Sequence, residues 1–550
     1  MKESDNSGGR TVLALGLSLV VLFAYYVLVS KYYGTTPPLD APLGQFDSPT
    51  AATATASPAG TATVPAEGGG APTTATDVPA AADIPEEFVE INTGLMRATL
   101  SNRGAVLQNV RLTDYTASDK RPVDVAAVPP ELVKVLALVD SNGEPVATAN
   151  YQVTLSGPNV LSAAEPETRV RFEGSLNGSN VTKELVFHHD SYTIGVTVSV
   201  IGAGAYSLAL GATPIWVAEE HKLNPSSYNH IGPVFLAGTE RESPTLGGQS
   251  AAAQFGAPER LSFFGWESAY FGLALAPHPG QALIARLWPR GEDYLIAADL
   301  PRDGSIREAT LYAGPKKLER LAAASPVFEQ LVDFGTFSIL SRPLLFLLNY
   351  FYRYVANYGI CIILLTVLVR VLFFPLTSTS FKSMRKMQKL QPKMKALRER
   401  FKKDPQRMNE EMMKLFKDNK VNHLSGCLPM LLQLPVFFAL YNTFYVAIEL
   451  RGAPFFLWIN DLSEKDPYYV TPIIMGITMV IQQRMTPMQG DPRQAQIMAI
   501  MPIIFTFMFL KFPSGLVLYW LVSNLLTIAQ QYVLNKSADH GDGEPAAKAA

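Results

Sequence analysis

A single arginine lies inside a long apolar run, where a charged side chain is costly. Arg370 falls within the run from Gly359 to Leu376, four residues after Thr366, so the two side chains share one face of a helix. An arginine at the centre of a membrane helix costs roughly 2.5 to 3.5 kcal/mol. None of the six long apolar runs of the chain contains Asp or Glu. Two explanations stay open: Arg370 snorkels to a nearby water interface, or it faces a hydrated groove between helices.

Polar side chains recur at helical spacing in the later apolar runs, which favours the groove. In chain order these stripes are Gln433, Tyr441 and Asn442, then Thr471, Thr478 and Gln482, then Trp520, Ser523, Asn524, Thr527, Gln530 and Gln531. One such stripe is usually explained by hydrogen bonds between helices. Several stripes together with an arginine that lacks an acidic partner predict a shared hydrophilic groove.

No pattern in the chain predicts catalysis, a cofactor or a metal site. The two cysteines, Cys361 and Cys427, lie in or beside apolar runs, and the adjacent His188 and His189 have no further ligand residue nearby. Phosphate-binding loops and nucleophile elbows are also missing from the sequence. We therefore expect a protein that is not an enzyme and that uses no cofactor, metal or nucleotide.

The apolar runs are long enough to cross a bilayer and organise the chain. Residues 11–30 follow a short segment, 1–10, that contains Lys2 and Arg10, and they continue without a small-residue cleavage site, which predicts an uncleaved signal anchor. Five more spans are expected at 359–376, 427–447, 469–485, 495–510 and 516–534. The predicted fold is a polytopic α-helical membrane protein with six transmembrane helices, five of which form a core, and a large antiparallel β-sandwich domain.

The β-sandwich is expected between the first two spans. Residues 34–83 consist largely of Thr, Ala, Pro and Gly and predict a flexible linker. Residues 84–325 show period-two patterns, such as Val196 to Val200, with turn residues near Asn177, as in an antiparallel sandwich. Residues 337–355 mix Leu and Phe with Arg and Tyr and predict an amphipathic helix at the membrane interface.

The segment 377–425 is strongly basic and sets the expected orientation. It carries fourteen Lys or Arg residues against five Asp or Glu residues. The positive-inside rule places this segment in the cytoplasm. Counting spans from it places the sandwich and the loops near Asp461 and Pro513 outside, and both termini, 1–10 and 535–550, in the cytoplasm.

The same basic segment is predicted to form a helical hairpin. Apolar residues at three- and four-residue spacing, typical of a coiled-coil seam, are Met387, Leu390, Met394, Leu397 and Phe401. Asp404 followed by Pro405 predicts the start of a second helix. Methionines adapt to varied apolar partners, and the basic exterior can attract ribosomal RNA or lipid phosphate. The residues through which we expect the cytoplasmic hairpin to make its contacts are Met384, Met387, Lys393, Met394, Met408 and Met412.

Five ordered blocks resemble the Gram-negative type of the YidC/Oxa/Alb insertase family. They are NYGICIILLTVLVRVLFFPLT from Asn357, LQPKMKALRERF from Leu390, GCLPMLLQLPVFFALY from Gly426, APFFLWINDLSEKDPYYVTPIIMG from Ala453 and FPSGLVLYWLVSN from Phe512. The resemblance covers nearly the whole chain. It implies a multi-pass protein of the bacterial inner membrane, with its large domain in the periplasm, that inserts, folds and helps to assemble integral membrane proteins.

The resemblance also implies residue roles. Arg370 would be the arginine of the groove, Gln433 and Trp520 would line it, and Thr366 and Tyr519 would lie on or near the substrate path. Together with the stripe residues Ser523 and Asn524, these form the expected substrate groove.

The partners implied by the resemblance are nascent membrane proteins, the SecYEG translocon with SecDF, the ribosome, the signal recognition particle receptor and membrane lipids, but no DNA. The sandwich would resemble sugar-binding sandwiches in fold and would be the part of the protein that is less essential for the family's function. The tail after Asn535 lacks a long basic extension, so any ribosome contact would fall to the hairpin and the loops.

Two other function classes fit parts of the pattern. A solute transporter or channel can also use a buried arginine, but the sequence lacks the paired inverted repeats of many transporters. A sugar-binding or sugar-modifying protein tethered to the membrane would not need five polar-striped spans.

Overall fold

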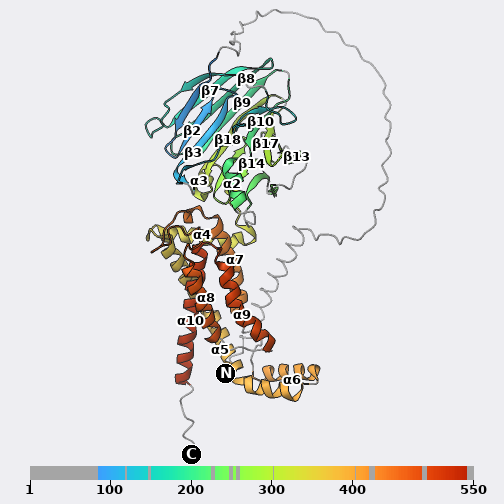
Figure 1. Cartoon of the computed structure of the whole chain (residues 1–550), viewed down its shortest axis with the longest axis vertical. Helices are drawn as coiled ribbons and strands as arrows, with labels where there is room; N and C mark the ends of the chain where they lie inside the picture. Colours follow the sequence, from blue (N-terminus) through green and yellow to red (C-terminus); the bar gives the residue numbers. More distant parts are fainter. Residues whose placement is uncertain are drawn as a thin grey trace, which may run out of the picture. The chain divides into compact units, whose positions relative to one another are not determined.

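The computed structural model describes residues 84–541 in two regions, a β-rich region followed by a helical region (Figure 1). Within this range the residues that are not described are 118–119, 147–149, 203, 224–229, 239, 247–251, 256–260, 302, 403, 420–427 and 486–491. The predicted N-terminal segment 1–10, the anchor 11–30, the linker 34–83, Cys427 and the end of the tail lie outside the described residues.

The largest sheet has nine strands, and all neighbouring strands are antiparallel. Their order across the sheet is β12 (Glu240–Glu242), β11 (Gly232–Ala237), β14 (Leu261–Glu267), β15 (Phe271–Ala276), β18 (Ser305–Pro315), β9 (Thr193–Ile201), β8 (Ser179–His188), β7 (Glu167–Leu176) and β6 (Gln152–Ser156). Every second side chain of β8 and β9 is buried. This alternation indicates that one face of each strand packs against a hydrophobic core and that the other face is less buried.

Two smaller antiparallel sheets complete the β-rich region. One has the order β13 (Ala253–Phe255), β16 (Ile284–Arg290), β17 (Asp293–Asp299), β10 (Ser207–Ala212) and β5 (Leu138–Val139), and the other the order β1 (Phe88–Asn92), β2 (Met96–Ser101), β3 (Val106–Thr116) and β4 (Pro122–Asp124). The indole of Trp266 on β14 donates to the carbonyl of Gly211 on β10 at 3.4 Å, so the large sheet reaches the five-stranded sheet. Of the predicted antiparallel β-sandwich, the antiparallel β-rich domain is confirmed.

The turn expected near Asn177 joins β7 to β8. Asn177 and Gly178 have φ angles of 50° and 79°, and Leu176 pairs with Ser179 directly across the loop. Positive φ at both central residues is the requirement of a type I′ hairpin turn, which Asn-Gly satisfies at low cost.

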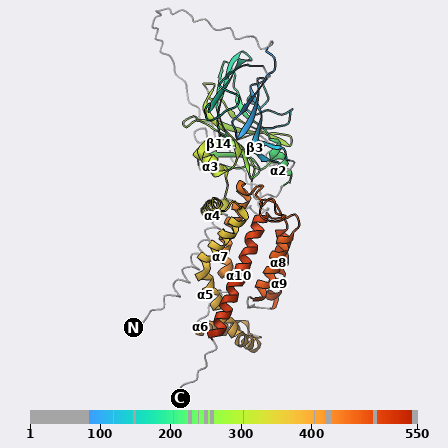
Figure 2. The ribbon, with the colours of Figure 1, turned by 90° about the vertical axis from the view of Figure 1, so that its left-hand side faces the viewer.

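Helices dominate the chain after β18. In chain order the described helices are α2 (Ile215–Leu223) within the β-rich region, then α3 (Leu318–Ala324), η1 (Pro326–Leu331), η2 (Gly335–Phe337), α4 (Ser338–Tyr352), α5 (Tyr358–Arg400), α6 (Pro405–Asp418), α7 (Leu428–Val446), η4 (Ile448–Leu450), α8 (Val470–Met485), α9 (Pro492–Phe509) and α10 (Ser514–Gly541). Helix α10 contacts α5, α7 and α8, while α8 contacts α9 and α4 contacts α5 and α7 (Figure 2).

Two of the described helices are long and apolar enough to cross a membrane. They are α5 and the part of α10 from Ser514 to Leu534. Helices α7, α8 and α9 occupy the other apolar runs expected after the sandwich, but α8 has only 16 residues, about 24 Å at 1.5 Å per residue. The apolar part of α9, Ala499–Phe509, is shorter still. The expected six transmembrane helices are therefore not confirmed by the described helices.

Helix α5 continues beyond the expected end of its membrane span. It runs for 43 residues from Tyr358 to Arg400 with Pro375 and Pro392 inside it, so the boundary expected at 376 is not a break in the helix. The hydroxyls of Thr377 and Thr379 donate to the carbonyls four residues earlier at 3.0 and 2.9 Å. The span and the first arm of the basic hairpin are one continuous helix.

Candidate functional site

Arg370 lies where α5, α7 and α10 meet. Its guanidinium donates to the carbonyl oxygen of Ser523 at 3.1 Å, to the side-chain oxygen of Gln433 at 3.4 Å and to the hydroxyl of Ser523. The amide of Gln433 donates in turn to the Ser523 hydroxyl at 3.1 Å. These partners are neutral, and no carboxylate pairs with Arg370 in the described part of the chain. The network orients the guanidinium and leaves its charge uncompensated.

Tyr519 is a further member of this network. It lies one turn before Ser523 on α10, is 2% exposed, and hydrogen-bonds with the side chains of Gln433 and Ser523. Four of the seven predicted groove residues, Arg370, Gln433, Tyr519 and Ser523, are thus brought together by three helices.

The other three predicted groove residues lie around this network rather than in it. The hydroxyl of Thr366 donates to the carbonyl of Ile362 at 2.6 Å within its own helix. Trp520 packs edge-on against Phe437, with ring centroids 4.8 Å apart and an interplanar angle of 88°. Asn524 donates to the hydroxyl of Thr478 at 3.2 Å and thereby joins α10 to α8.

Polar contacts between α5 and α10 continue from Arg370 toward the basic hairpin. The amide of Gln530 on α10 donates to the hydroxyls of Thr377 at 2.9 Å and Ser378 at 3.1 Å on α5. The polar stripe of the sequence contained Gln530 but missed Thr377 and Ser378. Their spacing of seven and eight residues from Arg370 was the available signal, because such residues share one helix face.

Apolar side chains border the network on the outer side of α5. Val371 and Leu372, next to Arg370, are 64% and 71% exposed. Such a surface suits lipid or another apolar helix. An uncompensated guanidinium beside an apolar surface can attract a carboxylate, because the charge-assisted bond would replace weaker bonds to neutral oxygens.

The basic hairpin packs its two arms together through methionines. Met387, Leu390 and Met394 of α5 are buried against residues of α6 that include Met412. Met384 is also buried, at 3% exposure, while Lys393 is exposed and Met408 is half-buried. Met387 and Met394, which the sequence placed in the coiled-coil seam, therefore join the two arms of the hairpin to each other.

The start of α6 follows the pattern expected from its sequence. Pro405 is the first residue of the helix, and the carboxylate of Asp404 accepts a hydrogen bond from the backbone N–H of Arg407 at 3.1 Å. The predicted start signal is confirmed. No group of acidic, cysteine and histidine residues suited to a metal ion occurs in the described ranges.

Two family models match the chain and together cover most of its length. The model of the YidC periplasmic domain matches residues 88–347, and the model of the 60Kd inner membrane protein matches residues 350–541. The first match contains the whole β-rich region, and the second contains α5 to α10.

Curated relatives match over long stretches. A protein of Syntrophus aciditrophicus is 38% identical and aligns with 96% of this chain and 99% of its own length. A protein of Geobacter sulfurreducens is 45% identical over 66% of this chain and 69% of its own length. Both are named membrane protein insertase YidC. A crystal structure of an active YidC insertase matches 82% of this chain at 20% identity with a TM-score of 0.36.

Proposed function

The chain belongs to the YidC family of membrane protein insertases, and we propose that it inserts newly made proteins into the bacterial inner membrane through a groove centred on Arg370. The observation that carries the groove is the position of Arg370 between three helices, where Gln433 and Ser523 hold it and no carboxylate of the described residues pairs with it. The family itself is named for membrane protein insertion and not for an enzymatic reaction.

The first proposed step is capture of a polar tail. A client segment that must cross the membrane carries peptide groups and charges that hydrocarbon does not solvate. The hydroxyls, amides and guanidinium along α5, α7 and α10 offer it hydrogen bonds and a positive charge partway through the bilayer. An acidic tail gains the most, because its carboxylate can accept charge-assisted bonds from Arg370.

The second proposed step is release of the apolar segment into lipid. The outer side of α5 exposes Val367, Val371 and Leu372, which provide an apolar surface next to the polar network. Transfer of the client segment along this surface into lipid yields about 0.8 kcal/mol per buried methylene. This driving force needs no nucleotide.

The proposed arrangement places the β-rich domain in the periplasm and the basic hairpin and both termini in the cytoplasm. The name of the periplasmic-domain family and the charge of residues 377–425 support it. Working partners would be nascent membrane proteins and lipids, with SecYEG, SecDF, the ribosome and the signal recognition particle receptor as further candidates. The exposed basic residues of the hairpin, such as Lys393, are the surface that we propose for ribosome contact.

Reconstitution tests both the function and the groove. The purified chain in sealed, nucleotide-free proteoliposomes should protect a single-span client with an acidic tail from added protease. Arg370→Ala should reduce this protection strongly and reduce protection of a neutral-tailed client less. Arg353→Ala, which removes an exposed arginine at the end of α4, is the matched control. Equal protection of both clients by Arg370→Ala would remove the proposed role of the arginine, and protection no greater than in empty liposomes would reject insertase activity.

A further inference from the structure

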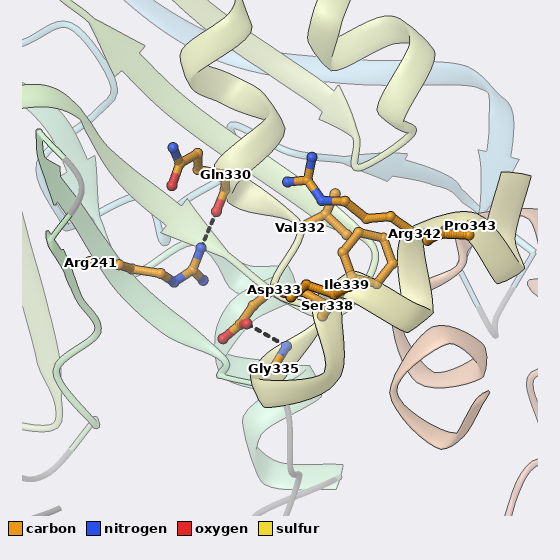
Figure 3. Close-up of a pocket in the computed structure, with 10 residues that line it drawn as sticks. Arg241, Gln330, Val332, Asp333, Gly335, Ser338, Ile339, Arg342 and Pro343 are labelled. Carbon is orange, nitrogen blue, oxygen red and sulfur yellow. Dashed lines mark hydrogen bonds between the residues drawn. The ribbon is translucent and has the colours of Figure 1, made fainter. Parts of the chain in front are cut away.

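A cavity of about 570 Å³ lies between β12, the 3-10 helices and the start of α4 (Figure 3). Its volume is within the range of roughly 300 to 1,000 Å³ that is usual for small-molecule sites. Both charged and apolar side chains line it, among them Arg241, Asp333, Phe334, Ile339 and Arg342. The cavity is remote from the Arg370 network in sequence and plays no part in the proposed insertion steps.

Positive charge is concentrated on one wall of the cavity. Arg241 forms an ion pair with Glu267, which is wholly buried, and its guanidinium also donates to the carbonyl of Gln330 (Figure 3). Lys316 pairs with the same carboxylate at 3.1 Å. Two cations, Arg241 and Lys316, therefore share the carboxylate of Glu267, and the three groups together keep one net positive charge. The bonds to Glu267 and to the carbonyl of Gln330 hold the Arg241 guanidinium at the cavity wall.

A second cation and one acid complete the polar lining. Arg342 is half-exposed, pairs with Glu329 at 3.4 Å and lies 5.9 Å from the centre of the Phe334 ring. The Asp333 carboxylate is exposed and accepts a hydrogen bond from the backbone N–H of Gly335 at 2.8 Å. Among the described residues no cation lies within ion-pair distance of Asp333. The lining thus offers sites for both a negative and a positive group.

The first turns of α4 add a strongly apolar exposed surface beside this lining. Ile339 is 86% exposed and borders the cavity, and Phe346, two turns later, is 67% exposed. Exposed aliphatic and aromatic side chains on a helix beside arginines are typical of the boundary between headgroups and acyl chains. An occupant should therefore be amphipathic.

We propose that this cavity binds the headgroup of an ethanolamine phospholipid from the outer leaflet. Its phosphate would accept bonds from Arg241 and Arg342, its primary ammonium would pair with Asp333, and its acyl chains would lie along Ile339. Arginine is well suited to the phosphate because its planar guanidinium can donate two parallel bonds. A phospholipid without an ammonium group would leave Asp333 unpaired beside its phosphate.

Lipid titration of the full-length protein in detergent, followed by native mass spectrometry, tests this site. One ethanolamine phospholipid should bind more tightly than the matching phosphatidylglycerol. Arg342→Gln should weaken ethanolamine lipid binding about tenfold, the effect expected from loss of a hydrogen bond to a charged group. Arg353→Gln, which changes an exposed arginine at the other end of α4, should leave binding unchanged.

Two further measurements show which parts of the lipid the cavity recognises. Asp333→Asn keeps an acceptor for the Gly335 N–H and should abolish the preference for ethanolamine over glycerol headgroups. Glycerophosphoethanolamine, which lacks acyl chains, should compete only weakly, because the exposed surface of α4 would stay uncovered. Equal binding of both lipids by the unaltered protein, or unchanged ethanolamine lipid binding in Arg342→Gln, would overturn the proposal. Neither readout depends on insertase activity.

Discussion

Two buried or half-buried cations, Lys183 and Arg370, have neutral oxygens as partners instead of carboxylates. Lys183 on β8 is 1% exposed. Its Nζ donates to the carbonyls of Gly104, Ala105 and Leu136 at 2.9, 3.0 and 2.6 Å. All three protons of an ammonium group are thereby used, and the large sheet is joined to the segments that lead into β3 and β5. Burial lowers the pKa of Lys183 to about 7.

Lys183 should make the stability of the β-rich domain depend on pH. Its pKa is lower in the folded state than in the unfolded chain, so between pH 7 and about 10.5 the unfolded state binds more protons and the free energy of unfolding rises with pH. The slope is at most about 1.4 kcal/mol per pH unit. Between pH 7 and 9 the unfolding temperature of the protein in detergent should therefore rise relative to that of Lys183→Met.

Between pH 7 and 9 the same substitution should also lower the free energy of unfolding. It leaves three carbonyls without their donor, and an unsatisfied buried polar group costs roughly 1 to 3 kcal/mol. If the unfolding temperatures of the two proteins changed in parallel between pH 7 and 9, the result would contradict the lowered pKa of Lys183. Lys183→Met with unaltered stability throughout would contradict the structural role of the three bonds.

Arg370→Lys separates the charge of Arg370 from its geometry. Lysine keeps the positive charge but cannot reproduce the planar donors that reach Gln433 and Ser523. If charge is what the client tail requires, proteoliposomes with Arg370→Lys should retain more than half of the protease protection of an acidic-tailed client, while Arg370→Ala loses most of it. Equal losses in the two variants would show that the guanidinium geometry is required.

At the scale of elements, helical spacing predicted which residues share a face but not which neighbour each one meets. It identified Gln433 and Ser523, which bond to Arg370. Thr366 also shares the face of Arg370, yet its hydroxyl is satisfied by the carbonyl of Ile362 one turn earlier. Trp520 packs on Phe437 because the aromatic residues of α7 and α10 face each other there, and that depends on how two helices pack.

The β-rich region was predictable for a similar reason. Alternation and the Asn177–Gly178 turn are local signals, and they predicted antiparallel strands and one hairpin. The division into one large and two small sheets follows from long-range pairs such as Leu208 with Ala298, and no local pattern encodes these. The length of α5 was also not predictable locally, because its prolines look like helix ends.

The packing of α8 against α9 depends on one glycine. A Cβ atom at Gly476 would overlap the hydroxyl oxygen of Thr506 on α9, so the two helices approach closely only without a side chain there. Gly476→Ala should lower the free energy of unfolding by roughly 1 to 3 kcal/mol through overpacking. Circular dichroism of the protein in detergent during heating would measure the loss.

A double substitution identifies the cause of that loss. Thr506→Ala removes the atom that the new side chain would meet, so it should recover part of the stability lost in Gly476→Ala. Ile477→Phe, which adds bulk at the adjacent and 55% exposed position, is the control and should have little effect. Strictly additive effects of Gly476→Ala and Thr506→Ala would exclude the proposed contact.

At the scale of the whole molecule, hydrogen bonds tie two helical connections together. The backbone N–H of Ser514 donates to the carbonyl of Glu464 at 2.7 Å, and that of Gly515 donates to the carbonyl of Leu462 at 2.9 Å. The connection between α7 and α8 and the turn between α9 and α10 therefore lie at the same end of the helices. If the helices cross a membrane, both connections must emerge on one side of it.

Cysteine labelling should place these two connections opposite to the basic hairpin. In a chain with Cys361 and Cys427 replaced by Ser, single cysteines can be introduced by Glu464→Cys, Lys511→Cys and Asn409→Cys, at three exposed positions. A membrane-impermeant maleimide should label the first two in spheroplasts, and it should label Asn409→Cys in inverted vesicles only. This pattern follows from the excess of Lys and Arg in residues 377–425, which resists transfer across the membrane. Labelling of Glu464→Cys and Lys511→Cys from different sides would contradict the bonded connections, and labelling of Asn409→Cys in intact spheroplasts would reverse the proposed orientation.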